Sequence, residues 1–494
     1  MSARRLPGRA AALIVGALPA LAFPAPSWWW LAWVGLVPLL LLVRAAPTAS
    51  DAAVRAWCGL AGFVLVTQYW LLPFAGPLLL VLAAVIGALW LPWGWFAHRL
   101  LSGAVTTRRL LAAMIVSPSA WVSAEAVRSW PSLGGPWAAL GASQWNQPVT
   151  LASAALGGVW LTSFLIVAVN TGIVGAMLAR GVAVRVSCLA IALACAGLGP
   201  AWFGWGPAPA AGSTVRVALV QPGVIDDAAA REAAGKALTA TLVGQRIDLV
   251  LWGESSVGLD PAGHPDDVRQ LADLSRKVGA DLLVNVDAPA PDGKIHKSSM
   301  LLGPDGPRGT YRKTRLVPFG EYVPLRPLLG WLTRYTKAAG QDRGRGSGPV
   351  VLYAGSLAIG PLISFEALFP DLPRREVQRG AQLLAYQTST STFQGSWAQP
   401  QLASAIAVRA AEVGHPAAHA GLSGDSAAFD ARGRNLAWCP SDYRGVRVVD
   451  VPLGLQVTVY QRLGEWVLVL AFSTLGAAGI WAVRSRLRPN YGVV

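Results

Sequence analysis

The sequence predicts a bundle of membrane-spanning helices joined to an extracytoplasmic α/β domain. Of the 494 residues, 53% are hydrophobic and only 14% are charged, which is too apolar for an ordinary soluble protein. Apolar runs of near-spanning length recur before Phe203. After Phe203 the pattern changes to short β-type runs that alternate with helical stretches. These observations predict two kinds of structure in one chain.

We expect about eight transmembrane helices, seven before the polar domain and one after it. The apolar runs are Ala10–Phe23, Trp28–Val43, Ala56–Leu72, Pro77–Phe96, Leu110–Val127, Val149–Leu178, Val186–Phe203 and Trp466–Val483. The first run is short and follows arginines, as in a signal peptide. Because a second apolar run follows within a few residues, we interpret the two runs as a retained helical hairpin.

Basic residues cluster in alternate loops between these runs. They are Arg4, Arg5 and Arg9; Arg44 and Arg55; Arg99, Arg108 and Arg109; Arg180 and Arg185; and Arg484, Arg486 and Arg488. The intervening loops hold few Lys or Arg, with Arg128 as the exception. The positive-inside rule then places both termini in the cytoplasm and the polar domain outside. The formal charge of +15 is therefore assigned to the membrane surface, and no nucleic-acid partner is expected.

The composition divides the chain into four parts. Residues 1–203 form the seven-helix membrane domain, 204–212 a linker rich in Pro, Gly and Ala, 213–462 the α/β domain, and 463–494 the last helix with a basic tail. In the α/β domain we predict strands at 215–220, 248–252, 281–286, 297–302, 356–365, 382–387, 415–420 and 426–430. We predict helices at 226–242, 265–278 and 401–413.

The cysteines and histidines offer no metal site or disulfide framework. Three of the four cysteines lie in apolar runs and Cys439 stands alone in the polar domain. His415 and His419 are four residues apart, but Pro416 breaks the helical spacing that a metal site would use. No cofactor is expected.

A carboxylate, an ammonium and a hydroxyl stand at or near strand ends in the polar domain. Glu254 ends Leu249-Val-Leu-Trp-Gly-Glu254, Lys313 follows Tyr311-Arg, and Ser364 follows Leu362-Ile. A desolvated carboxylate suits a general base, an ammonium can stabilise an oxyanion, and a turn after a strand presents a nucleophile. Each residue taken alone could have an ordinary structural role, Glu254 as a turn carboxylate, Lys313 as a surface lysine and Ser364 as a small turn residue. Together they predict acyl transfer.

Other polar residues could support this site. Glu321, in Gly320-Glu-Tyr-Val-Pro324, could orient Lys313 or act as a second acid or base, and Glu366 could hold the same lysine. In the membrane frame, Glu125 and Arg128 stand at helical i,i+3 spacing, either as an interfacial ion pair or as polar groups facing a lipid headgroup. The Gly- and Trp-rich loop beginning Leu133-Gly-Gly-Pro-Trp137 is expected to lie under the polar domain.

The assembled motifs resemble the bacterial apolipoprotein N-acyltransferases over nearly the whole chain. The most specific match is Leu316-Val-Pro-Phe-Gly-Glu-Tyr-Val-Pro324, and the frame of seven spans, an outer domain and a closing span also matches. The resemblance implies a nitrilase-like (carbon–nitrogen hydrolase) αββα domain. It implies Glu254 as general base, Lys313 as oxyanion-stabilising lysine, position 364 as nucleophile and Glu321 as a supporting acid. Glu366, Phe365 and Tyr322 are expected to support the site.

The resemblance also implies the reaction. A phospholipid donates an acyl chain to the enzyme, which passes it to the α-amino group of a diacylglyceryl-cysteine lipoprotein. The expected partners are these two substrates and membrane lipid, with the chain acting as a monomer in the bacterial cytoplasmic membrane.

The chain departs from the family pattern at the site itself. It has Ser364 where the family has cysteine, Gly253 where a proline is usual, and Thr388-Ser-Thr-Ser-Thr-Phe393 in place of a segment containing Asn-Asp. Two alternatives to a working N-acyltransferase are therefore kept. One is a non-catalytic relative that binds lipoprotein or lipid and assists an active paralogue. The other is a membrane-attached amidase or other acyltransferase.

Overall fold

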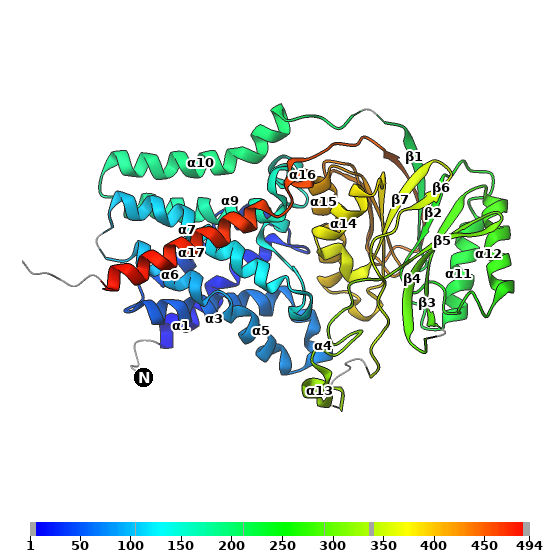
Figure 1. The fold of residues 1–494 in the computed structure, drawn as a ribbon, viewed down its shortest axis with the longest axis horizontal. Helices are drawn as coiled ribbons and strands as arrows, with labels where there is room; N and C mark the ends of the chain where they lie inside the picture. The colour runs from blue at the N-terminus through cyan, green and yellow to red at the C-terminus, as the bar shows by residue number, and fades with distance from the viewer. Residues whose placement is uncertain (1–5, 104, 211, 291, 335–339, 488–494) are drawn as a thin grey trace, which may run out of the picture.

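The computed structural model describes residues 6–103, 105–210, 212–290, 292–334 and 340–487. A helical bundle and an α/β domain lie side by side along the long axis of the molecule (Figure 1). Arg4, Arg5 and Arg488, which contributed to the predicted orientation, lie outside the described residues.

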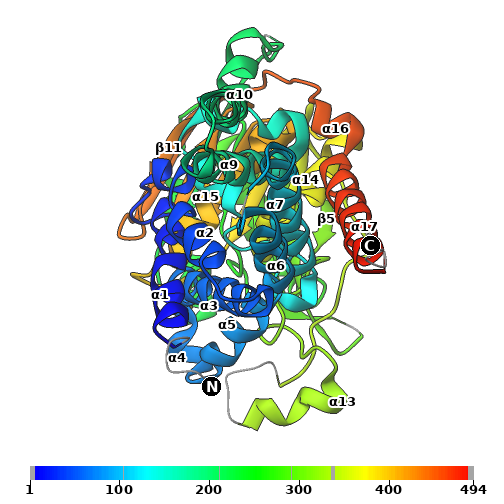
Figure 2. The same ribbon diagram turned by 90° about the vertical axis from the view of Figure 1, so that its left-hand side faces the viewer.

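The bundle is built from the N-terminal helices and the last one. They are α1 (Leu6–Gly16), α2 (Val37–Arg44), α3 (Ala49–Thr67), α4 (Leu72–Ala75), α5 (Leu78–Ala88), α6 (Leu91–Leu101), α7 (Thr107–Arg128), α8 (Pro148–Leu151), α9 (Ala154–Leu178), α10 (Val182–Trp205) and α17 (Trp466–Leu487). Figure 2 looks onto the bundle and shows α17 at its rim, where it packs beside α7.

Several of these helices are long and apolar enough to cross a membrane. Within the described residues four pass this test, namely α3, α7, α9 and α10, and α5 with α6 forms a fifth candidate bent by 45°. The first two predicted runs and the last correspond to shorter apolar helices. Several helices have proline in their first turn, such as Pro38 in α2 and Pro92 in α6, where the missing N–H has no partner within the helix in any case. The count of eight spans stays a prediction.

One helix of the bundle is broken at two glycines. In α9, Gly157 and Gly158 leave the helical conformation, and Gly158 has φ +68°. A Cβ at Gly158 would lie 2.9 Å from the ring of Tyr460. Glycine is therefore required here both for the backbone angle and for the close approach of Tyr460.

The α/β domain contains two six-stranded sheets. The first has the order β12-β1-β2-β3-β4-β5 and the second β11-β10-β9-β8-β7-β6. The strands are β1 (Thr214–Gln221), β2 (Leu249–Trp252), β3 (Asp281–Pro289), β4 (Ile295–Gly303), β5 (Gly306–Arg312), β6 (Leu352–Ala354), β7 (Leu357–Ile363), β8 (Leu383–Thr388), β9 (Ala417–Gly421), β10 (Ser426–Phe429), β11 (Asn435–Cys439) and β12 (Gly445–Pro452).

Helices cover the outer faces of both sheets, which gives four layers. Helices α11 (Ala228–Ala240) and α12 (Pro265–Val278) lie on the first sheet, far from the bundle. Helices α14 (Asp371–Gln378) and α15 (Ala398–Val413) lie on the second sheet, between it and the bundle (Figure 1). Apolar strand residues of both sheets meet in a shared core. The short helix α16 (Val459–Leu463) packs on α9 at the junction with the bundle, whereas α13 (Arg326–Leu329) projects from the molecule (Figures 1 and 2).

The predicted strands and helices of this domain are all present, but the sequence patterns missed several elements. Strands β5, β6, β11 and β12 and helices α13, α14 and α16 had not been predicted. Strand β5 reads Gly306-Pro-Arg-Gly-Thr-Tyr-Arg312 and contains almost no apolar residues. It forms because it pairs with β4, so tertiary pairing overrides its weak local preference.

Candidate active site

The three predicted site residues all follow strands of the α/β domain. Glu254 lies two residues after β2, Lys313 directly after β5, and Ser364 directly after β7. Strand β2 runs parallel to β3, and β5 also runs parallel to β3 because two antiparallel steps separate them. The carboxyl ends of β2 and β5 therefore lie at one edge of the first sheet.

Ser364 forms a sharp turn between β7 and a short 3-10 helix, η7 (Ser364–Leu368). It is half-buried and has φ +55°, which is rare for a residue with a side chain and is often found at functional sites. Ile363, the last residue of β7, pairs with Gln387 in the neighbouring parallel strand β8. The turn thus holds the hydroxyl-bearing residue at the end of the second sheet.

Glu254 reaches the same place from the first sheet. Its backbone N–H donates to the carbonyl oxygen of Thr388 at 3.1 Å, and its Oε2 accepts from the N–H of Ser389 at 2.9 Å. Glu254 is 1% exposed. The end of β8 therefore holds Glu254, and β8 is the direct neighbour of β7, the strand that Ser364 follows.

Lys313 completes the predicted group. Its Nζ lies 2.9 Å from Glu321 Oε1 and 3.4 Å from Glu254 Oε1, and its side chain is fully buried. Burial by itself would raise the pKa of Glu321, but the ammonium groups of Lys313 and Lys297 outweigh burial and hold that pKa well below its ordinary value. The expected role of Glu321 in orienting Lys313 fits this contact.

Lys297, the third residue of β4, joins this group of charges, and the sequence did not reveal it. Its Nζ lies 2.7 Å from Glu254 Oε1, 3.6 Å from Glu321 Oε1 and 3.7 Å from Asp287 Oδ2. Burial would lower the pKa of Lys297, but these three carboxylates outweigh it and raise the pKa. Arg343 also donates to Asp287, at 2.5 Å. A period-two pattern places Lys297 and Ser299 on one face of β4, but that signal alone does not distinguish a site from a surface.

Glu366 holds the backbone of the site and not the lysine ammonium. Its Oε2 accepts from the N–H of Ile363 at 2.8 Å, and its Oε1 accepts from the N–H groups of Thr314 and Arg315 at 2.7 and 3.0 Å. The hydroxyl groups of Thr314 and Tyr311 donate to Oε1 as well, at 2.7 and 2.8 Å. The expectation that Glu366 contacts Lys313 directly is replaced by a link between the serine turn and the residues that follow the lysine.

Phe365 and Tyr322 connect the site to the loop between α7 and α8. Phe365 is buried against Phe369, with ring centroids 4.9 Å apart, and a Cβ on Gly135 would lie 2.8 Å from its ring. The hydroxyl group of Tyr322 lies 3.4 Å from that of Ser132. The loop that was expected under the polar domain therefore does lie against it.

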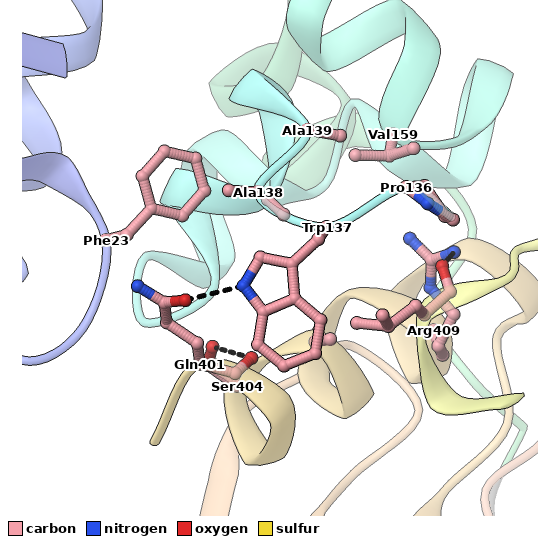
Figure 3. Close-up of a pocket in the computed structure, with 12 residues that line it drawn as sticks. Phe23, Pro136, Trp137, Ala138, Ala139, Val159, Gln401, Ser404 and Arg409 are labelled. Carbon is pink, nitrogen blue, oxygen red and sulfur yellow. Dashed lines mark hydrogen bonds between the residues drawn. The ribbon is translucent and has the colours of Figure 1, made fainter. Parts of the chain in front are cut away.

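The same loop binds α15 through a tryptophan. Trp137 Nε1 donates to Gln401 Oε1 at 2.7 Å, and the two side chains border a small cavity of about 20 Å³ between bundle and α15 (Figure 3). Arg409 also lines this cavity and donates to the carbonyl oxygen of Leu368 at 3.0 Å. Leu368 ends the short helix that Ser364 begins, so α15 braces the serine turn.

Glu125 and Arg128 do not face lipid. Both side chains are 3% exposed. Glu125 Oε1 accepts from Trp121 Nε1 at 2.9 Å and from the N–H of Leu140 at 2.7 Å. Its contacts hold the α7–α8 loop on the bundle, and the headgroup interpretation is wrong.

Comparison with known proteins places this geometry in a family. The pattern of the apolipoprotein N-acyltransferase N-terminal domain matches residues 15–172, and that of the carbon-nitrogen hydrolases matches residues 216–459. The chain belongs to the apolipoprotein N-acyltransferase family. Its α/β domain has the nitrilase-like fold of the carbon-nitrogen hydrolases.

Relatives of this family align along the whole length. An apolipoprotein N-acyltransferase of Geobacter metallireducens is 29% identical, with 95% of this chain and 94% of that protein covered. One from Azotobacter vinelandii is also 29% identical, covering 97% and 95%. Among solved structures, an amidase of the nitrilase superfamily from Nesterenkonia is 21% identical, covering 49% of this chain and 93% of its own, with a TM-score of 0.36.

Proposed function

We propose that this chain is an apolipoprotein N-acyltransferase that uses Ser364 as its nucleophile. The substrates are a phospholipid, which donates the acyl chain, and a lipoprotein with a diacylglyceryl-cysteine at its N-terminus, which accepts it. Two contacts carry this proposal. Lys313 lies 3.4 Å from Glu254 at the edge of the first sheet, and the Glu366 carboxylate joins the backbone of Ile363, which precedes Ser364, to that of Thr314, which follows Lys313.

In the first half-reaction Ser364 Oγ attacks the carbonyl carbon of the phospholipid ester. Glu254 accepts the hydroxyl proton, and Lys313 stabilises the oxyanion that develops on the carbonyl oxygen. When the tetrahedral intermediate collapses, the bond to the glycerol oxygen breaks. That oxygen takes the proton from Glu254, a lysophospholipid leaves, and the acyl chain stays on Ser364 as an ester.

In the second half-reaction the α-amino group of the lipoprotein attacks this ester. Glu254 accepts a proton from the attacking nitrogen and returns it to Ser364 Oγ as that oxygen leaves. The products are an amide on the lipoprotein and the free enzyme. Conversion of an ester into an amide runs downhill, so the serine does not oppose the overall reaction.

Serine makes the first half-reaction demanding. A cysteine thiol has a pKa of about 8.5, whereas an aliphatic hydroxyl ionises far less readily. Ser364 therefore depends on proton acceptance by Glu254 as the C–O bond forms. We infer that acylation of Ser364, and not transfer to the amine, limits turnover.

We place the α/β domain on the outer side of the bacterial cytoplasmic membrane, with both ends of the bundle's chain on the inner side. The beginning of α1 and the end of α17 lie at the end of the bundle remote from the sheets (Figure 1). The arginines of the alternate loops support the same orientation. One chain supplies every proposed group, so we propose a monomer.

Mass spectrometry of lipoprotein N-termini tests the proposal. Purified protein in phospholipid vesicles is incubated with a diacylated lipopeptide, and the acylated amine is measured. Ser364→Ala should abolish the product, and Ser364→Cys should retain or raise the rate. Ser356→Ala removes an exposed serine before β7 and serves as the matched control. Undiminished acylation by Ser364→Ala would refute the serine as nucleophile and favour the non-catalytic alternative or another nucleophile.

A further inference from the structure

We propose that Lys297 is a positioning residue of the acyl-transfer site, which holds the Glu254 carboxylate in place beside Lys313. This inference rests on the proposed function, and it assigns to the site a second lysine that the sequence motifs do not contain. Lys297 is the third residue of β4 and does not follow a strand end, unlike Lys313.

The two lysines and two glutamates form a closed square of alternating charge. The short sides are Lys297–Glu254 at 2.7 Å and Lys313–Glu321 at 2.9 Å. The long sides are Lys313–Glu254 at 3.4 Å and Lys297–Glu321 at 3.6 Å. Each carboxylate thus has one close ammonium partner and one more distant one, and Glu254 has Lys297 as its closest.

The contacts of the two carboxylate oxygens of Glu254 show the effect of this arrangement of charges. The ammonium groups of Lys297 and Lys313 both approach Oε1, and the N–H of Ser389 occupies one position on Oε2. A carboxylate oxygen offers two lone-pair directions, so the remaining capacity lies on Oε2. That oxygen is fixed by Ser389, which directly follows β8. Lys297 therefore directs proton acceptance to Oε2.

Lys297 is also held in place from both neighbouring strands. On β3, its register partner is Asp287, whose carboxylate is a third partner of the ammonium at 3.7 Å. On the β5 side, the N–H of Lys313 donates to the carbonyl oxygen of Lys297 at 2.9 Å. The side chain is only 13% exposed. Without it, the buried Glu254 and Glu321 and the half-buried Asp287 would have only Lys313 and Arg343 as cationic partners within this group.

The charge balance predicts a measurable consequence. Removal of Lys297 makes protonation of the neighbouring carboxylates easier, so the base is ionised only at higher pH. The same loss of positive charge makes formation of any anion at position 364 harder. The first effect raises the midpoint of the pH profile of activity, and the second raises the midpoint of the pH profile of reaction at position 364. A purely structural contact would lower stability or total activity without such a shift.

The first test compares pH profiles of kcat/KM for lipopeptide acylation in phospholipid vesicles. In Lys297→Met the acid-limb midpoint should rise by about one pH unit, with a roughly tenfold loss of kcat/KM at pH values below that midpoint. Lys297→Arg should keep the midpoint close to that of wild type. Lys294→Met, which removes an exposed lysine three residues away, is the matched control. If Lys297→Met does not fold, Lys297→Gln takes its place.

The second test does not need turnover. In the Ser364→Cys background, alkylation at position 364 is followed by peptide mass spectrometry across the pH range, which separates it from the four native cysteines. Adding Lys297→Met should raise the half-maximal pH by about one unit. An inactive wild-type protein would refute the proposed function, while this second test would still decide the role of Lys297. If Lys297→Met leaves the pH midpoint unchanged in each profile that can be measured, of kcat/KM or of alkylation, the inference is overturned.

Discussion

Replacement of Glu366 by alanine should both destabilise the α/β domain and stop acyl transfer. Glu366 is fully buried and accepts five hydrogen bonds, from Ile363, Arg315 and Tyr311 and two from Thr314. A hydrogen bond to a charged group contributes about 1.5–3 kcal/mol. The five values do not add, because the donors share one acceptor group. We expect a loss of about 4 kcal/mol, near the upper end for single substitutions.

That loss corresponds to a fall of roughly 10 °C in the thermal midpoint of a domain of this size. The assay is thermal denaturation of the purified protein in vesicles, together with lipopeptide acylation at a temperature where the variant is folded. Tyr311→Phe removes one of the five donors and should lower the midpoint by about 5 °C. Asp305→Ala, an exposed turn residue, is the control. A Glu366→Ala protein with a midpoint within about 1 °C of wild type and normal activity would refute the reasoning.

Three further predictions concern the site and the bundle. Glu254→Gln keeps the shape of the side chain and removes the base, so kcat/KM should fall at least about 100-fold, measured at a temperature where the variant is folded; normal activity would exclude Glu254 as the base. Gly158→Ala should destabilise by about 1–3 kcal/mol, because the residue has φ +68° and a Cβ would meet Tyr460, and an unchanged thermal midpoint would contradict this. The pKa of Glu321 is lowered from 4.5 to about 2, against burial, by Lys313 and Lys297, so its stabilising contribution is present above pH 4.5 and lost as pH falls toward 2. The difference in thermal midpoint between wild type and Glu321→Gln should therefore narrow over that window, and a constant difference would count against the ion pair.

The sequence revealed those parts of the site that stand after apolar strands. Glu254 follows β2 and Ser364 follows β7, and both strands are buried runs with clear ends. Lys297 was missed because it lies within β4, between the buried residues His296 and Ser298 on the opposite face, where a lysine resembles a solvent-exposed strand residue. The structure alone shows that Lys297 is enclosed, because the ends of β5 and β2 lie close to it.

The sequence predicted that the membrane frame consists of apolar helices, but it did not predict where those helices are interrupted. Apolar composition indicated the helices, but the run Val149–Leu178 contains α8 and the distorted glycines of α9. Composition does not report this break, because glycine and small apolar residues are common in continuous membrane helices as well. The break depends on Tyr460, which is distant in sequence and fits against Gly158.

Helix α15 makes the two halves of this chain mutually dependent. One side of the helix packs on the second sheet, and the other side meets Trp137 and the cavity at the bundle. An α/β domain cut free of the bundle would present this surface to water and lose part of the support beneath Ser364. Expression of residues 213–462 alone should accordingly yield an aggregation-prone and poorly active protein. A water-soluble relative could be engineered from it only by redesigning the exposed side of α15.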